Sequence, residues 1–377
     1  MKSVRFLLPL LLLLCTFSLC GCTSKEEKKI EDAVKQELDQ LKDLDSITTQ
    51  KYISYQELFP GEPEDITISS DIEEVFSLFF QDFDYKILDV NVDKDKQSAQ
   101  ANLRLVTLDA HALAEDFSKA QLKHEISQSA SSEEATEQTI SLEERRYTLL
   151  NELLKSNDYQ TVERNCTISL DASDKDGETS WEIRRTNTLE NDLVGGLMND
   201  LTDPDILSPE DTILVYLNTL KNMSAEELGN YLNADSIIST EDPAKISLAE
   251  ALVKQVHSTF DYSIGETTVS GYTATVTANI TTFDSDAILE NYQKELDSYL
   301  ASVDAVIDGA QKRYEKSYSL LLEYIEENTA TKTVETTFTL INDGASWKLE
   351  DAGTVFGQAL FGTLSSSPVE DKQETNG

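Results

Sequence analysis

The side chains that could do chemistry are few, and the most regular of them form an aspartate–tyrosine pair that occurs twice. Asp84-Tyr85 and Asp261-Tyr262 each follow a phenylalanine, where a helical pattern gives way to a strand pattern. A tyrosine beside a carboxylate could orient a ligand, or act as acid and base if both groups were buried and perturbed. Neighbouring side chains of a strand point to opposite faces, so the two groups of each pair are expected to diverge. We favour a structural role, and we retain these four residues as ligand-binding candidates with no catalytic residue assigned.

Histidines and cysteines do not add a catalytic or metal site. The chain has three histidines, His111, His124 and His257, and none is spaced from another histidine or a cysteine as metal ligands are. His257 falls on Phe80 in an internal repeat, which predicts a packed helix face. Cys166 shares the strand phase of its apolar neighbours, which predicts a buried and unreactive thiol. We therefore expect no bound metal and no cofactor.

The charge of the chain restricts its partners. Of the 377 residues, 31 are Lys or Arg and 70 are Asp or Glu, which gives a net charge of −39. Such a surface repels phosphate backbones, so nucleic-acid binding is not expected. Three of the four cysteines lie within the first 22 residues, which excludes a disulfide scaffold for the remainder.

The first 22 residues have the pattern of a secretory signal that ends in a lipid-attachment motif. Lys2 and Arg5 precede an apolar run that is too short for a good transmembrane helix. The run closes with Leu19-Cys20-Gly21-Cys22, which resembles the lipobox of bacterial lipoproteins. The resemblance implies a signal peptide over residues 1–21, a diacylglycerol on the Cys22 thiol, and a mature chain anchored to the outer face of the cell membrane, in a bacterium expected to be Gram-positive. The alternative is an ordinary cleaved signal that happens to contain a cysteine.

The rest of the chain consists of two copies of one sequence unit. Matching residues are separated by 179 positions at the start of each copy, then by 177, 175 and finally 166, as small insertions and deletions in turns would produce. The only two tryptophans, Trp181 and Trp347, fall on each other at the last of these separations.

Each copy is predicted to begin with helices and continue into antiparallel hairpins. Ser208-Pro209 is a helix start, with a capping residue before a proline at the first helical position. Residues 260–284 alternate with period two around Ser270-Gly271, and a second hairpin spans 331–350. Between the hairpins lies a helical insertion over about 288–325, with Asp308-Gly309 as a kink or hairpin point. Its apolar stripe is expected to pack against its own sheet, with a coiled-coil partner face as the alternative.

This element order defines the predicted fold class and domains. The class is α+β, with two tandem repeats that each pack helices on a curved antiparallel sheet. The order resembles the nuclear transport factor 2-like (cystatin-like) cone, from which the long insertion departs. The predicted domains, after the signal peptide, are a lipidated tether over 22–29, a first repeat over 30–201, a linker over 202–207, a second repeat over 208–364 and a disordered tail over 365–377.

The sequence is compatible with three functions. The favoured one is a non-enzymatic binding or interaction module of the cell envelope, with the membrane, an envelope protein or a small ligand as partner. The alternatives are an envelope hydrolase or isomerase that uses a cone pocket, and a structural spacer. A pocket lined by converging polar groups would favour the enzyme, whereas a filled cone with an exposed apolar insertion would favour the spacer.

Overall fold

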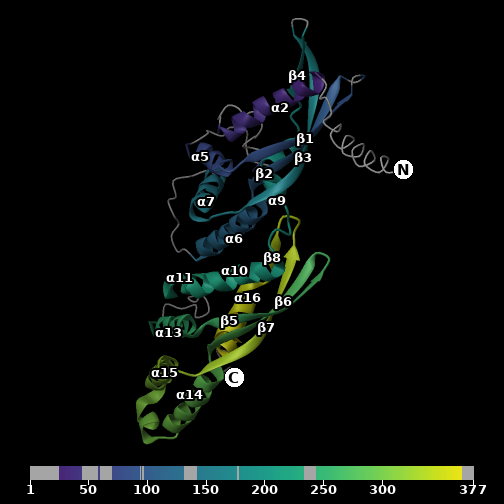
Figure 1. Ribbon diagram of the computed structural model, residues 1–377. Helices are drawn as coiled ribbons and strands as arrows, with labels where there is room; N and C mark the ends of the chain where they lie inside the picture. Colours follow the sequence, from purple (N-terminus) through teal and green to yellow (C-terminus); the bar gives the residue numbers. More distant parts are fainter. Residues whose placement is uncertain are drawn as a thin grey trace, which may run out of the picture. The chain divides into compact units, whose positions relative to one another are not determined.

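The computed structural model describes residues 25–44, 58–59, 70–93, 95, 97–130, 142–175, 178–232 and 243–366. They form two compact units (Figure 1). Unit 1 contains the described residues up to Leu113 and those from 142 to Leu201, and unit 2 contains 114–130 and those from Thr202 onward. The predicted signal peptide, the lipidation site Cys22 and almost all of the predicted tail lie outside the described residues.

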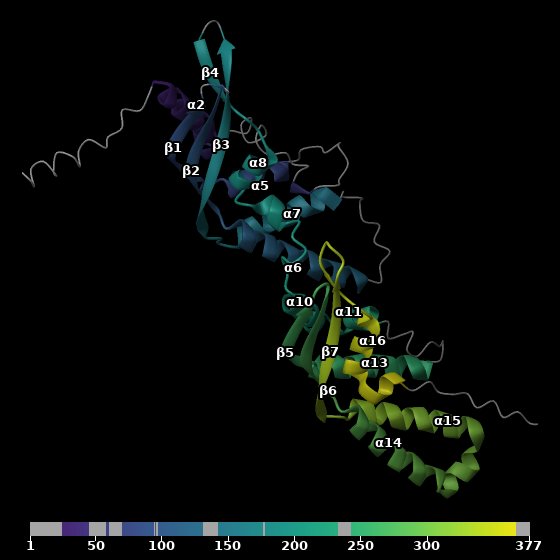
Figure 2. The same cartoon turned by 90° about the vertical axis from the view of Figure 1, so that its right-hand side faces the viewer.

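Each unit contains a four-stranded antiparallel sheet whose strands follow chain order, which confirms the α+β class (Figure 2). The unit 1 strands are β1 (Asp84–Asp93), β2 (Ser98–Leu108), β3 (Thr161–Lys175) and β4 (Glu178–Ile183). The unit 2 strands are β5 (Asp261–Ser270), β6 (Thr273–Phe283), β7 (Thr331–Asn342) and β8 (Trp347–Leu349).

The two sheets bend at equivalent places. The pairing of β1 with β2 shifts between Ile87 and Asp89, and that of β5 with β6 shifts between Ile264 and Thr267. Such bulges increase twist and curvature. In β5 the bulge requires Gly265, because a Cβ there would lie 2.4 Å from the Thr277 hydroxyl.

The helices of unit 2 bury one face of its sheet. Ser208 caps α10 (Pro209–Asn222) by accepting a hydrogen bond from the Asp211 amide, as predicted. Next come α11 (Ala225–Tyr231), α13 (Pro243–Thr259) and, after the sheet, α16 (Ala352–Phe361), which runs into a 3-10 turn over Gly362–Ser366. The ordered backbone therefore extends two residues into the predicted tail. The side chains of Phe338 and Phe356 are fully buried, with their ring centroids 5.2 Å apart, so aromatic side chains fill the space beside the sheet.

Unit 1 is built on the same plan and begins earlier than predicted. Helix α2 (Lys25–Lys42) buries Ile30, Val34, Leu38 and Leu41 and contacts the sheet. Residues 25–29 of the predicted tether are thus helical, because the first turn has acids at Glu26 and Glu27, which favour a helix start. The other helices are α5 (Ser70–Phe79), α7 (Leu142–Ser156), α8 (Asn187–Leu193) and α9 (Leu197–Asp200).

Helix α6 (Ala110–Ser129) follows β2, and its residues from Ala114 onward group with unit 2. Ile126 and Ala130 belong to the buried cluster that also contains Ile213 of α10. The predicted first repeat, 30–201, includes this segment, so the compact units are not simply consecutive in sequence.

The helical insertion of unit 2 is a hairpin of α14 (Ser285–Leu300) and α15 (Val303–Glu326), which projects from the sheet (Figure 2). Helix α14 ends at Leu300, and Ser302 caps α15 by accepting a hydrogen bond from the Ala305 amide. The prediction of a kink or hairpin point at Asp308-Gly309 is confirmed as a kink, with Gly309 at φ 68°. Among the described helices, none is long and apolar enough to cross a membrane.

Candidate functional site

A polar groove of 320 Å³ runs between α2 and β1 of unit 1 and includes both members of the first predicted pair. It is lined by Glu31, Lys35, Asp39, Lys42, Asp84, Tyr85 and Ile87. Apart from Ile87 and Tyr85, every lining residue carries a charge at neutral pH. A small polar ligand in this groove would therefore lie close to charged groups of both signs.

The two members of the first pair both contact α2. Lys42 Nζ lies 2.8 Å from Asp84 Oδ1, and Tyr85 Oη donates a hydrogen bond of 2.7 Å to Asp39 Oδ1. The expectation that the two side chains diverge is wrong for this site. Asp84 is the first residue of its strand, and the long Lys42 side chain reaches it. Asp39 and Lys42 are three residues apart and so share one face of the helix.

Unit 2 repeats this arrangement at the same separation of 179 positions along the helix. Lys221 Nζ lies 2.6 Å from Asp261 Oδ1, and Tyr262 Oη donates a hydrogen bond of 2.5 Å to Asn218 Oδ1. Lys221 Nζ is also 5.8 Å from the centre of the Tyr262 ring. We call the two sets the Lys–Asp–Tyr clusters: Asp39, Lys42, Asp84 and Tyr85 in unit 1, and Asn218, Lys221, Asp261 and Tyr262 in unit 2.

Hydrogen bonding and burial shift the pKa values of Asp84, Lys42 and Tyr85 in the unit 1 cluster. The hydrogen bond from Lys42 lowers the pKa of Asp84, and the hydrogen bond to Asp84 raises the pKa of Lys42. Burial, followed by the bond to Asp39, raises the pKa of Tyr85. All three pKa values move away from neutrality, whereas a general acid or base works best with a pKa close to the operating pH. In unit 1 the three groups join α2 to β1.

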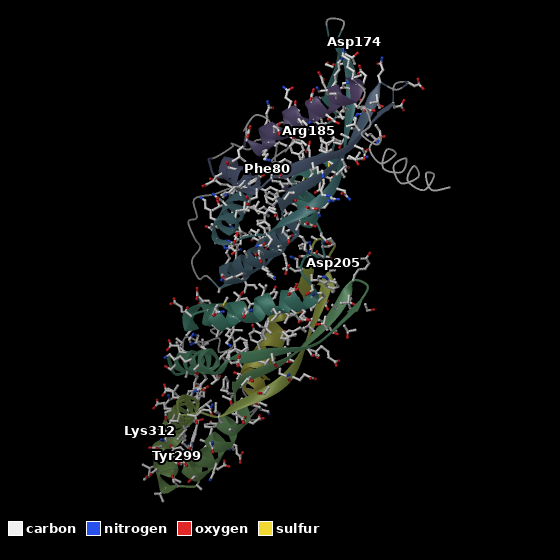
Figure 3. The ribbon with its side chains drawn as sticks, in the orientation of Figure 1. Phe80, Asp174, Arg185, Asp205, Tyr299 and Lys312 are labelled. Carbon is white, nitrogen blue, oxygen red and sulfur yellow. The ribbon has the colours of Figure 1, made fainter. Side chains whose placement is uncertain are left out.

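A second repeated contact joins each tryptophan to a carboxylate near the start of its unit, and the sequence analysis missed it. Trp181 Nε1 donates to Glu26 Oε2 at 3.4 Å, and Trp347 Nε1 donates to Asp205 Oδ1 at 2.9 Å. Asn342 Nδ2 donates to the same Asp205 oxygen at 3.1 Å. Figure 3 labels Asp205. Glu26 and Asp205 are also 179 positions apart, so the sequence repeat could have identified the two carboxylates as equivalent. Asp205 of the predicted linker 202–207 is thus bonded into the fold of unit 2.

The predicted thiol behaves as expected, whereas one histidine does not. Cys166 is buried, and burial raises the pKa of its thiol to about 12. The neighbouring Asp192 forms a hydrogen bond with it, and burial raises the pKa of that carboxyl. His257 is exposed on α13, whereas Phe80 is buried, so the predicted packed histidine is wrong. Within the described ranges, the His, Cys, Asp and Glu side chains do not assemble into a group of three that could hold a metal ion.

Comparison with known proteins gives a similarity to a solved structure. No protein-family model matches the chain, and no curated protein sequence matches it. Among solved structures, the chain is similar to a crystal structure of the Bacillus subtilis protein YcdA, described as a candidate lipoprotein. The two are 12% identical, the similarity covers 74% of this chain and 96% of that chain, and the TM-score is 0.28.

Proposed function

We propose that this protein is a lipoprotein anchored through Cys22 to the outer face of the cell membrane of a Gram-positive bacterium. The observation that carries the proposal is the order of Lys2 and Arg5, an apolar run, and then Leu19-Cys20-Gly21-Cys22. Lipidation at Cys22 would leave a mature chain with 29 basic and 70 acidic residues, a charge of −41. An acidic surface of this kind favours solubility outside the membrane.

The two units are proposed to act as non-enzymatic interaction modules of the nuclear transport factor 2-like type. Helices on one face of a bent antiparallel sheet support that assignment in each unit. The absence of enzymatic activity is proposed because the polar pair that could have served catalysis is engaged in helix-to-strand contacts in both units. In unit 2, buried Phe338 and Phe356 occupy the space beside the sheet, where a catalytic cone would need an open pocket.

A second candidate is the binding of a small polar ligand in the groove between α2 and β1. The charged lining described above favours it, because lysines and carboxylates lie side by side there. A molecule with both amino and carboxylate groups would match that lining. This role is compatible with the anchor and with the absence of catalysis.

The anchor is tested by the Cys22→Ala variant in the native host. We expect the wild-type protein to sediment with membranes and to incorporate labelled lipid, and the variant to incorporate none. Equal labelling of the two proteins would contradict the assignment. The absence of catalysis is tested by turnover assays on envelope substrates: activity that Tyr85→Phe or Tyr262→Phe abolishes, with the fold intact, would favour an enzyme.

A further inference from the structure

The turn of the α14–α15 hairpin in unit 2 exposes an apolar surface, which we call the tip patch. Its members and their exposed fractions are Leu300 at 48%, Val303 at 74%, Val306 at 79%, Ile307 at 74% and Tyr314 at 44%. Isolated exposed apolar residues are common, but a contiguous group of aliphatic side chains at the end of a projecting element marks a contact surface. The turn between α14 and α15 lies at the end of the hairpin furthest from the sheet (Figures 1 and 2).

A helix cap and a hydrogen bond between the two arms define the conformation of the tip patch. Val303, Val306 and Ile307 have the i, i+3, i+4 spacing that places them on one helix face, while Ala305 points inward and is buried. Ser302 caps this first turn of α15, and the kink at Gly309 ends the segment. Tyr299 Oη, from the other arm, donates a hydrogen bond of 2.9 Å to Asp308 Oδ2 and ties the two arms together at the tip.

The size of the patch argues against a second protein copy as its main partner. Stable protein interfaces bury about 800 Å² on each partner and involve about 20–30 residues a side. Five partly exposed side chains fall well short of that number. Inserting a few aliphatic groups into the apolar part of a bilayer, by contrast, requires no large complementary surface.

The net charge around the tip patch is closer to zero than that of the whole acidic chain, which favours contact with a lipid surface. Residues 292–317, which include the end of each arm, contain five acids and four bases and so carry a net charge of −1, whereas the whole chain carries −39. The nine charged residues are Glu295, Asp297, Asp304, Asp308, Glu315, Lys294, Lys312, Arg313 and Lys316. Electrostatic repulsion from anionic headgroups is therefore small at this point of the surface.

Tyrosines follow the aliphatic tip along both arms. Tyr292 and Tyr299 lie on α14, and Tyr314 and Tyr318 lie on α15 with ring centroids 4.6 Å apart. Figure 3 shows Tyr299 and, on the opposite arm, Lys312 near the end of the hairpin. Tyrosine is enriched at membrane–water interfaces, where the ring contacts the acyl boundary and the hydroxyl stays hydrated. Tyr292 and Tyr299 bond across the hairpin to Ser317 and Asp308, and Tyr318 packs against the buried cluster. Tyr314 is the exposed ring of the four, so it is the one placed to lie at such an interface behind the aliphatic tip.

We propose that the tip patch inserts into the headgroup region of a phospholipid bilayer and gives unit 2 a membrane contact of its own. The insertion is driven by burial of Val303, Val306 and Ile307, so it requires neither Cys22 nor a particular headgroup. Binding is expected to be weak and reversible, because only a few aliphatic groups are buried.

The test uses the chain from residue 22 onward, produced without its signal segment and therefore without lipid, so that it is independent of the proposed anchor. Flotation is measured with vesicles of phosphatidylcholine alone and of phosphatidylcholine with one quarter phosphatidylglycerol. The double variant Val306→Ser/Ile307→Ser removes the most exposed aliphatic groups. The matched control is Val269→Ser/Tyr272→Ser, which removes two apolar residues of 54% and 77% exposure elsewhere in the same unit. Circular dichroism confirms that each variant is folded.

The wild-type chain is expected to float with both vesicle types, the tip variant to bind about tenfold more weakly, and the control to bind as the wild type does. A wild-type chain that stays at the bottom of the gradient overturns the proposal. So does equal loss in the control, or a wild-type dimer in light scattering that becomes a monomer in the tip variant, since that result assigns the patch to a second copy.

Discussion

Replacing Trp347 by alanine is expected to destabilise unit 2 strongly and to leave unit 1 unchanged. The Trp347 ring is 6% exposed, and its Nε1 donates to Asp205, a residue at the start of the same unit. Truncation of a buried tryptophan to alanine costs about 3–5 kcal/mol of the free energy of unfolding. We expect a value in this range.

Two further substitutions divide this cost between the ring and the hydrogen bond. A hydrogen bond to a charged group contributes about 1.5–3 kcal/mol when buried, but the Asp205 side chain is exposed and can bind water when its partner is lost. We therefore expect Asp205→Ala to cost only about 1 kcal/mol. Trp347→Phe keeps most of the buried ring and is expected to cost about 1–2 kcal/mol.

The two tryptophans make the assay selective. With Trp347 replaced, Trp181 is the only indole left, so fluorescence follows unit 1 while circular dichroism follows both units. In urea, with a slope of about 2 kcal/mol per molar, a loss of about 4 kcal/mol lowers the midpoint by roughly 2 M. The circular dichroism transition is expected to become biphasic, with the Trp181 transition unmoved.

Either of two results would refute this reasoning. A cost below about 1 kcal/mol for Trp347→Ala would show that the ring does not pack in the core of unit 2. A Trp181 transition that shifts by the same amount as the circular dichroism signal would show a single cooperative core instead of two.

Three other predictions concern single side chains. The Cys166 thiol, whose pKa is raised to about 12, should not react with a disulfide reagent at pH 8 until urea unfolds the chain; fast reaction under native conditions would contradict its burial. The hydrogen bond from Lys221 lowers the pKa of Asp261. Their ion pair therefore stabilises unit 2 fully at pH values above the usual carboxyl pKa of about 4, and this stabilisation is lost as the pH falls through the lowered pKa of Asp261. Lys221→Met should therefore flatten the acid limb of the stability curve, and an unchanged limb would count against the pair. Tyr85→Phe should lower the free energy of unfolding by about 1 kcal/mol in a urea titration. In turnover assays on envelope substrates the variant should behave as the wild-type protein does.

The sequence repeat was sufficient to predict much of each fold. Alternation with period two located β5 and β6, and the Ser208-Pro209 start located α10, because turn and capping signals are local. The kink at Gly309 was predicted, but the helix break at 301–302 was missed, because the apolar pattern continues through it and only the cap at Ser302 marks it.

The candidate residues were easier to find than to interpret. Asp84 and Tyr85 were identified from their repetition, but alternation within a strand could not show that Lys42 and Asp39 reach them from one face of α2. The exposure of His257 depends on which face of α13 packs inward, and its counterpart Phe80 gave the wrong indication. Contacts between distant segments, such as Trp347 with Asp205, depend on tertiary packing that no local pattern encodes.

The central claim, anchorage through Cys22, is tested most directly by the mass of the amino-terminal peptide of the protein purified from its native membrane. The account predicts a peptide that begins at Cys22 and carries a diacylglycerol on its thiol. A peptide that begins elsewhere, or one that contains an unmodified Cys22, would contradict it.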